Sequence, residues 1–180
     1  MDAQNYTSLV LPMVEADVLL RPFRNAHVLT PAVTLPAHIT LVAPFTSPED
    51  IDSEMLASLS ALFRSFFAPR LSFHDIGRFE KAEVLFLAPI DPAPLYELSK
   101  RILALRPAGF DLDKHTFHLT LAHRPFSLDI AEQAFRQGYE SLLPFTESID
   151  RAELYSKTRG QWTLTARFPF NRERATNCTA

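Results

Sequence analysis

The chain has 180 residues, of which 47% are hydrophobic and 22% are charged, so it suits one globular domain and is not globally disordered. Its formal net charge of −3 argues against broad nonspecific DNA binding, which needs many phosphate contacts, but is compatible with a local basic surface. The single cysteine, Cys178, excludes an intrachain disulfide. The acidic N-terminus and the lack of an 18-residue apolar run lead us to expect a cytoplasmic monomer without a membrane span.

The first part of the chain is predicted to alternate between strands and helices. In chain order we expect a strand at 8–11, a helix at 14–21, a loop at 24–36, a strand at 38–42 and a helix at 47–68. The last helix has a strong start signal, because the cap residue Ser47 is followed by Pro48 and two acidic residues. Pro69 is expected to end it.

The second part continues the alternation, with short links between several strands. We expect a strand at 71–79, a hairpin link at 80–82, a strand at 84–90, a helix at 94–105, a strand at 117–122, a helix at 128–139, and strands at 145–156 and 161–168 around a turn at Arg159-Gly160. Links of hairpin length favour antiparallel sheets, so the predicted fold class is α+β. A single domain at 1–170 would be followed by a polar tail at 171–180.

One internal repeat carries the functional prediction. Residues 37–45 read Ala-His-Ile-Thr-Leu-Val-Ala-Pro-Phe, and residues 117–126 read Phe-His-Leu-Thr-Leu-Ala-His-Arg-Pro-Phe. Both contain His-x-Thr-Leu followed by Pro-Phe, and the two histidines, His38 and His118, are 80 residues apart. Each half of the chain is therefore predicted to hold one His-x-Thr strand followed by a helix.

The spacing of the repeat places the polar residues on one face of each strand. Since residues i and i+2 of a strand share a face, His38 lies beside Thr40 and His118 beside Thr120, with the apolar partners pointing to the other side. If a pseudo-twofold axis relates the halves, the two His/Thr pairs face each other.

Two histidines that face one reactive group can act as an acid–base pair. An unperturbed imidazole titrates near pH ~6.5, so one ring can accept a proton while the other donates one. Threonine hydroxyls can donate hydrogen bonds to the nonbridging oxygens of a phosphate held between them. This chemistry requires no metal and no cofactor.

Two other interpretations of the histidines are open. They could be hydrogen-bonded core residues, although polar residues repeated at the same offset in two strands argue against an accident. They could also bind a metal with His115 or His123, but no carboxylate or cysteine stands at typical ligand spacing.

The paired motifs, His38-Ile39-Thr40-Leu41 and His118-Leu119-Thr120-Leu121, resemble those of the 2H phosphoesterase superfamily, in the branch of 2′-5′ RNA ligases and RNA 2′,3′-cyclic phosphodiesterases. The resemblance covers nearly the whole chain. It implies two pseudo-symmetric lobes of antiparallel sheet with flanking helices and an active cleft between them. It also implies that the two histidines are catalytic, that Thr40 and Thr120 position the phosphate, and that the partner is a nucleotide or an RNA end.

The chain departs from that family at one position. Many members carry an arginine five residues after the second histidine, where this chain has His123, followed by Arg124. On an unbroken strand Arg124 shares the face of His118 and His123 points away, unless a bulge at Ala122 shifts the register. We therefore expect Arg124 to bind the substrate, with His123 as the alternative.

The remaining candidates are less specific. Aromatic residues that could stack a nucleobase stand in the two predicted hairpins: Phe73, Phe79, Phe86, Tyr155 and Trp162. Arg78 and Lys114 could line a phosphate groove, while His27, His74 and His115 fit surface or core positions. The leading hypothesis is a metal-independent phosphodiesterase, and the alternative is a noncatalytic nucleotide- or RNA-binding module of the same fold.

Overall fold

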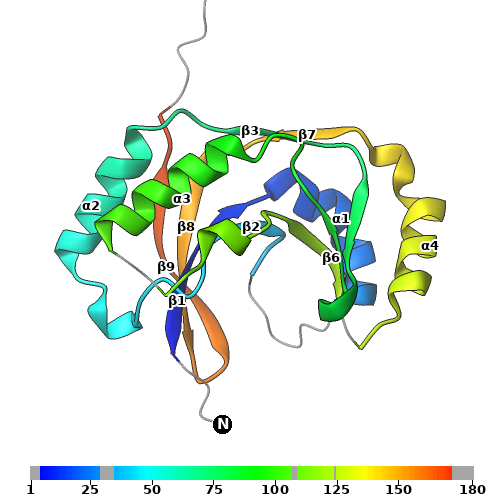
Figure 1. Cartoon of the computed structure of the whole chain (residues 1–180), viewed down its shortest axis with the longest axis horizontal. Coiled ribbons are helices and arrows are strands. Elements are labelled where there is room, and N and C mark those ends of the chain that lie inside the picture. Colours follow the sequence, from blue (N-terminus) through cyan, green and yellow to red (C-terminus); the bar gives the residue numbers. More distant parts are fainter. Residues whose placement is uncertain (1–4, 29–34, 107–108, 124, 172–180) are drawn as a thin grey trace, which may run out of the picture.

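The computed structural model describes residues 5–28, 35–106, 109–123 and 125–171. Its helices are α1 (Val14–His27), α2 (Ser53–Arg64), α3 (Ala93–Leu105) and α4 (Leu128–Gly138). Its strands are β1 (Tyr6–Pro12), β2 (His38–Val42), β3 (Arg70–Phe73), β4 (Ile76–Phe79), β5 (Val84–Leu87), β6 (Leu119–His123), β7 (Phe145–Ser148), β8 (Arg151–Thr158) and β9 (Gln161–Pro169). The predicted α+β class with antiparallel strands is confirmed (Figure 1).

Seven strands form one antiparallel sheet in the order β4-β5-β6-β2-β1-β8-β9, and β3 pairs with β7 in a second sheet. Apart from the edge strand β9, the order is symmetric about the β6–β2 pair, because the segment β1-α1-β2-α2-β3-β4 repeats as β5-α3-β6-α4-β7-β8. The predicted pseudo-symmetric halves are therefore present, and they join into a single sheet through the two motif strands.

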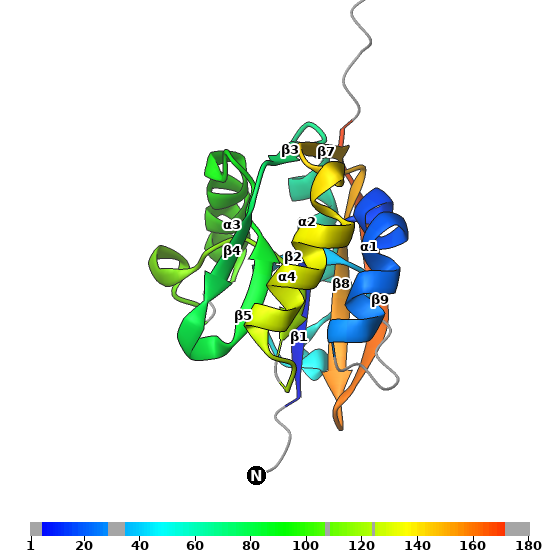
Figure 2. The same ribbon diagram turned by 90° about the vertical axis from the view of Figure 1, so that its right-hand side faces the viewer.

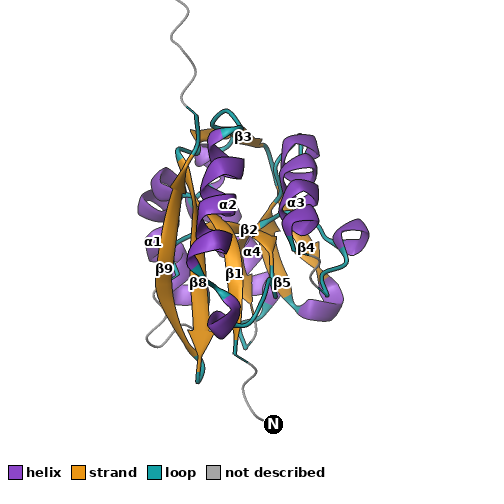
Figure 3. Cartoon of the chain, turned by 90° about the vertical axis from the view of Figure 1, so that its left-hand side faces the viewer, coloured by secondary structure: helices purple, strands orange, loops and turns teal. Residues whose placement is uncertain are grey.

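The helices are exchanged between the halves. Helix α1 packs against β6, and its counterpart α3 packs against β2. Helices α1 and α4 lie on one side of the molecule (Figure 2), whereas α2 and α3 lie on the opposite side (Figure 3). Each half thus supplies the helix that covers the motif strand of the other half.

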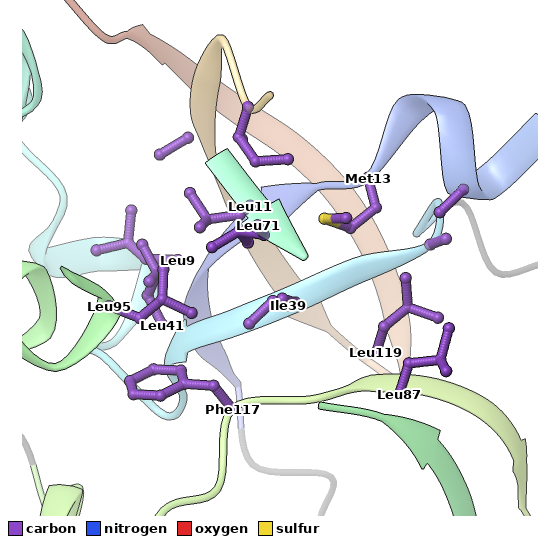
Figure 4. Close-up of a cluster of buried hydrophobic side chains, with 14 of the residues drawn as sticks. Leu9, Leu11, Met13, Ile39, Leu41, Leu71, Leu87, Leu95, Phe117 and Leu119 are labelled. Atoms are coloured by element: carbon purple, nitrogen blue, oxygen red, sulfur yellow. The ribbon is translucent and has the colours of Figure 1, made fainter. Parts of the chain in front are cut away.

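One face of the sheet carries the apolar core. Side chains that alternate along the central strands, such as Leu9 and Leu11 on β1, Ile39 on β2 and Leu119 on β6, are fully buried together (Figure 4). In a strand, alternate residues point to opposite sides, so the residues between them share the other face. We call that other face, which carries His38, Thr40 and Thr120, the histidine face.

Four of the predicted elements differ in length or continuity from the structure. Helix α1 continues to His27 instead of ending at Arg21, although Pro22 lies inside it. The additional turn is held because Phe23 packs against α4 and Arg24 forms an ion pair with Asp17 of the same helix. The helix predicted from Ser47 is interrupted after a 3₁₀ turn at Pro48–Asp50, and α2 begins anew where Asp52 accepts a hydrogen bond from the Met55 amide at 2.8 Å.

The strands predicted at 71–79 and 145–156 are each divided in two. Both divide at corresponding places, after Phe73 and after Ser148, and the first segments, β3 and β7, pair with each other outside the main sheet. The hairpin at 80–82 is confirmed, and so is the turn at Arg159-Gly160, where both residues have positive φ (51° and 81°) as a two-residue hairpin turn requires. The tail from residue 172 lies outside the described residues.

Candidate active site

The two His-x-Thr strands are direct neighbours at the centre of the sheet. Strands β2 and β6 run antiparallel with Ile39 opposite Leu119, so counting outward places Thr40 opposite His118 and His38 opposite Thr120. The intervening Ile39, Leu41, Leu119 and Leu121 are fully buried in the core. The fold therefore brings the four motif side chains together on the histidine face, as the repeat predicts.

Both motif strands contain the same irregularity. The register shifts between Thr40 and Val42 opposite β1, and between Thr120 and Ala122 opposite β5, which leaves Leu41 and Leu121 as the extra residues. Such a bulge lets two successive side chains enter the core. Leu121 and Ala122 are accordingly both fully buried.

This bulge corrects the expectation for His123. After the shift His123 lies opposite Val84, whose face of β5 is that of Phe86 and Thr120, so His123 is on the histidine face rather than pointing away. The unbroken-strand argument for Arg124 consequently fails, and Arg124 itself lies outside the described residues.

The two histidine rings are held in matching ways. Nδ1–H of His38 donates to the Pro36 carbonyl at 2.7 Å, and Nδ1–H of His118 donates to the Thr116 carbonyl at 2.7 Å. A carbonyl only accepts, so these bonds place the hydrogen on Nδ1 and leave Nε2 of each neutral ring with a lone pair. Both rings can then accept a proton at Nε2, or donate one when charged.

Side chains from outside the sheet bind the backbone of both motif threonines. Arg24 on α1 donates from Nε to the Thr120 carbonyl at 3.1 Å, and His115 donates from Nε2 to the Thr40 carbonyl at 3.1 Å. The Tyr96 hydroxyl on α3 donates in turn to the His115 carbonyl at 2.7 Å. The described ladder between β2 and β6 consists of the single residue pair Ile39–Leu119. The side chains of Arg24 and His115 therefore provide hydrogen-bond donors for the two threonine carbonyls.

Helix α1 also fixes the start of β2. Asp17 accepts from the Ala37 amide at 2.8 Å and from Arg24 Nη1 at 3.1 Å with the same oxygen, Oδ1. Because Ala37 precedes His38 and Arg24 contacts Thr120, the Asp17–Arg24 pair connects the two motif strands. Sequence reasoning missed this pair, whose only signal was the spacing of seven residues on one helix face.

The surroundings favour the neutral form of the histidines. Burial lowers the pKa of His38 to about 4, against the bond to Pro36, and the charges of Arg24 and His118 lower it further. Burial also lowers the pKa of His118, against its bond to Thr116. Of the two rings, His38 is therefore the one that holds a proton less readily.

A search of curated protein sequences finds no match to this chain. The family model described as the 2′-5′ RNA ligase superfamily matches residues 12–161. The chain belongs to this superfamily. The 2H phosphoesterase resemblance of the paired motifs is thereby confirmed.

Solved structures share the fold at low sequence identity. Escherichia coli LigT complexed with NADP+ has 16% identity and a TM-score of 0.59, and the match covers 92% of this chain and 98% of that one. A structure described as a phosphoesterase has 17% identity and a TM-score of 0.58, covering 93% and 98%. LigT complexed with 3′-AMP has 18% identity and a TM-score of 0.55, covering 92% and 97%. These likenesses establish the fold alone.

In this member of the 2′-5′ RNA ligase superfamily, aromatic rings surround the second histidine. Phe79 and Phe86 stack at 4.1 Å, and their ring centroids lie 5.1 and 5.4 Å from that of His118. Gly77 lies opposite Phe86, and a Cβ at Gly77 would stand 2.6 Å from the Phe86 ring. The absence of a side chain there lets the Phe86 ring lie flat over β4.

The other candidates of this superfamily member lie in different surroundings. Phe73 is fully buried in a stack with Phe145, so it is unavailable to a base. Tyr155 is buried and donates to Glu153 at 2.9 Å. Arg78 pairs with Asp129, Glu132 and Glu80, and Lys114 pairs with Asp111, which explains both as charged surface residues.

The remaining histidines are also placed. His74 is exposed between β3 and β4, and His27 stacks on Phe23 at 4.3 Å. His115 is a partner of the Thr40 backbone rather than an isolated residue. Within the described ranges, no group of three or more His, Cys, Asp or Glu side chains could hold a metal ion, and no helix there is long and apolar enough to cross a membrane.

Proposed function

We propose that the protein is a phosphodiesterase that hydrolyses a 2′,3′-cyclic phosphate, or a related 2′-5′ linkage, on an RNA end or a small nucleotide. The observation that carries the proposal is the pair of histidines with Nδ1 bound to backbone and Nε2 left for proton transfer, opposite two threonines on one face. Family membership and the nucleotide-bound LigT structures support the same class of substrate.

The reaction needs two proton transfers at opposite sides of the phosphorus. A neutral ring accepts a proton at Nε2 from water as the water oxygen bonds to phosphorus. The charged ring donates its Nε2 proton to the ribose oxygen as the bond from that oxygen to phosphorus breaks. The product is a phosphomonoester, and each positioned proton transfer contributes roughly 10²- to 10⁴-fold in rate. With a ribose 5′-hydroxyl in place of water, the same groups open the cyclic phosphate onto that hydroxyl and protonate the departing 3′-oxygen, which is a 2′-5′ ligation.

In this proposal the two motif threonines and two further side chains hold the phosphate. Thr40 and Thr120 supply hydroxyl donors, and hydrogen bonds to an anion are stronger than neutral ones. His123 and Arg124 are the proposed further substrate contacts, and the register of β6 favours His123. A base on the side of His118 would meet the exposed part of the Phe79–Phe86 stack.

The test is turnover of a 2′,3′-cyclic mononucleotide in EDTA. We expect hydrolysis to a single phosphomonoester that survives the chelator, because no step uses a metal. A noncatalytic binding module would bind the nucleotide without product formation, and activity restored only by a divalent ion would contradict the two-histidine mechanism. His74→Ala serves as the control, since it removes an exposed histidine away from the motifs.

A further inference from the structure

Two side-chain hydrogen bonds cross from one half of the chain to the other beside the motif strands. Within the described residues, β2 and β6 are in register at a single residue pair. Arg24 of the first half binds the Thr120 carbonyl of the second at 3.1 Å. His115 of the second half binds the Thr40 carbonyl of the first, also at 3.1 Å. These bonds therefore contribute to the relative position of the two His/Thr pairs.

The two halves supply these donors in different ways. The offset of 80 residues between the motifs relates His115 to Leu35, so the first half has a leucine where the second has this histidine. The donor of the first half comes instead from helix α1, where Arg24 pairs with Asp17. His115 is thus a feature of the second half alone and lies outside the duplicated motif.

The segment from His115 to His118 connects Thr40 to the ring of the second motif histidine. His115 donates from Nε2 to the Thr40 carbonyl, and the Thr116 carbonyl accepts from Nδ1–H of His118 at 2.7 Å. Phe117 between them is buried, and its ring centroid lies 4.8 Å from that of His115. A shift of His115 would consequently move both the motif threonine and the imidazole that lies opposite it.

Helix α3 holds both partners of the bond between His115 and Thr40. The Tyr96 hydroxyl donates to the His115 carbonyl at 2.7 Å. One turn along the helix, the buried Ser99 hydroxyl donates to the Leu41 carbonyl at 3.1 Å. Leu41 follows Thr40 at the bulge of β2. The same helix therefore fixes the backbone of the donor residue and the backbone next to the acceptor.

The chemistry of His115 suits a fixed donor rather than a proton carrier. Because a carbonyl only accepts, the bond to Thr40 places the hydrogen on Nε2, the opposite tautomer from His38 and His118. Burial lowers the pKa of His115, against its bond to Thr40, and the charge of His118 lowers it further. The ring is therefore neutral at pH 7 while it binds the carbonyl.

We propose that His115 is a positioning residue of the site, which holds Thr40 at the distance from His118 at which one phosphate reaches both groups. This inference rests on the proposed function. Small displacements of groups around a reacting centre lower the rate strongly, because the productive geometry is lost. Removal of the His115 donor should therefore lower kcat more than it raises KM.

The kinetic test compares two substitutions of His115 on a 2′,3′-cyclic mononucleotide. His115→Phe keeps an aromatic ring and removes the donor, so we expect kcat to fall about tenfold while KM changes less than about twofold. His115→Gln supplies an amide N–H near the place of Nε2 and should regain most of the lost rate.

The matched control is His27→Phe, which should leave kcat unchanged. The His27 ring also bonds a backbone carbonyl, that of Phe23 at 2.9 Å, but this carbonyl belongs to the same helix. Equal losses of rate in His115→Phe and His115→Gln would mean that the ring acts through packing, which contradicts a role for the hydrogen bond.

A second measurement does not depend on turnover. The NMR shifts of the ring nitrogens distinguish the histidine tautomers, and we expect Nε2–H for His115 but Nδ1–H for His38 and His118. The backbone amide signals of Thr40 and Leu41 should shift in His115→Phe and stay in place in His27→Phe.

The outcomes separate this inference from the proposed function. Hydrolysis by the wild type with an unchanged kcat in His115→Phe, or an Nδ1–H tautomer of His115, would overturn the positioning role and leave the phosphodiesterase intact. A wild type without turnover would contradict the proposed function. In that case shifted Thr40 and Leu41 signals in His115→Phe would still support the placement of Thr40 by His115, and unshifted signals would overturn it.

Discussion

The two halves of the sheet share one framework but differ in what they place on the histidine face. Opposite Thr120, β5 and β4 present Phe86 and Gly77, whereas opposite Thr40, β1 and β8 present Val10 and Glu153. One wall is therefore aromatic, whereas the other presents an aliphatic side chain and a carboxylate that is paired with Arg151 and Arg167. The backbone framework of the motif is duplicated, while the side chains around it differ between the halves.

The largest effect should come from removing one histidine of either half. His38→Ala and His118→Ala are each expected to lower kcat by roughly 10²-fold or more, because each removes one proton transfer. The double variant should lose little beyond the weaker single variant, since the two rings act as a unit. Steady-state rates on a cyclic nucleotide measure this, and normal turnover by either single variant would break the equivalence of the halves.

The next effect concerns Arg24, which binds the Thr120 carbonyl where the other half uses His115 on the Thr40 carbonyl. Arg24→Gln removes the guanidinium that binds the Thr120 carbonyl and Asp17, so we expect a loss of about 2–3 kcal/mol in the free energy of unfolding. The pKa of His38 should rise, because the charge of Arg24 lowers it. Denaturant unfolding and NMR titration of His38 check both.

Arg21 offers the matched control for this change. Its guanidinium also pairs with Asp17, at 2.7 Å, but its side chain is 60% exposed. Exposed ion pairs contribute little, so Arg21→Gln should cost less than about 1 kcal/mol. Equal losses in the two variants would mean that Arg24 acts only as a surface ion pair.

The pH dependence of stability should distinguish the two histidines. A folded pKa below the unfolded value means that the unfolded chain binds protons first, so stability is present above pH 6.5 and is lost as the pH falls toward 4. For His38 the loss is at most about 3 kcal/mol. The free energy of unfolding, measured from pH 7 to 4, should depend less on pH in His38→Gln than in His118→Gln. The reverse order would contradict the stronger perturbation of the His38 pKa.

The smallest effect should come from Gly77, which lies on the edge strand β4 opposite Phe86. Gly77→Ala would push a methyl group into the Phe86 ring, and overpacking of this kind typically costs 1–3 kcal/mol. We expect about 1–2 kcal/mol, because the displaced ring lies at the edge of the core, together with a several-fold rise in KM. Gly138→Ala, where a Cβ meets nothing within 4 Å, is the control. An unchanged KM would remove the Phe79–Phe86 stack from substrate binding.

The sequence was most informative where local signals and burial agree. The strand at 38–42 was predicted to the residue, and the helix at 94–105 to within one, because apolar periodicity and flanking prolines mark them. The motif residues could be placed on one face of each strand because the His-x-Thr spacing is local to each motif.

The sequence did not predict which distant segments of the chain contact each other. The division of 71–79 depends on β7 pairing with β3, some 75 residues later, and the face of His123 depends on a bulge set by β5. Arg24 stood in a predicted loop, yet it contacts Thr120, 96 positions away. Contacts between distant residues produce no hydrophobic periodicity, so a pattern read over a short window does not reveal them.

The exchange of helices between the halves bears on how the protein folds. Because α1 covers β6 and α3 covers β2, neither half can close its own apolar surface before the other has arrived. The first and eighth strands must also meet across most of the chain. Folding should therefore be slow and all-or-none, without a stable intermediate built from one half. A chain cut between β4 and β5 would regain structure only when both fragments are present together.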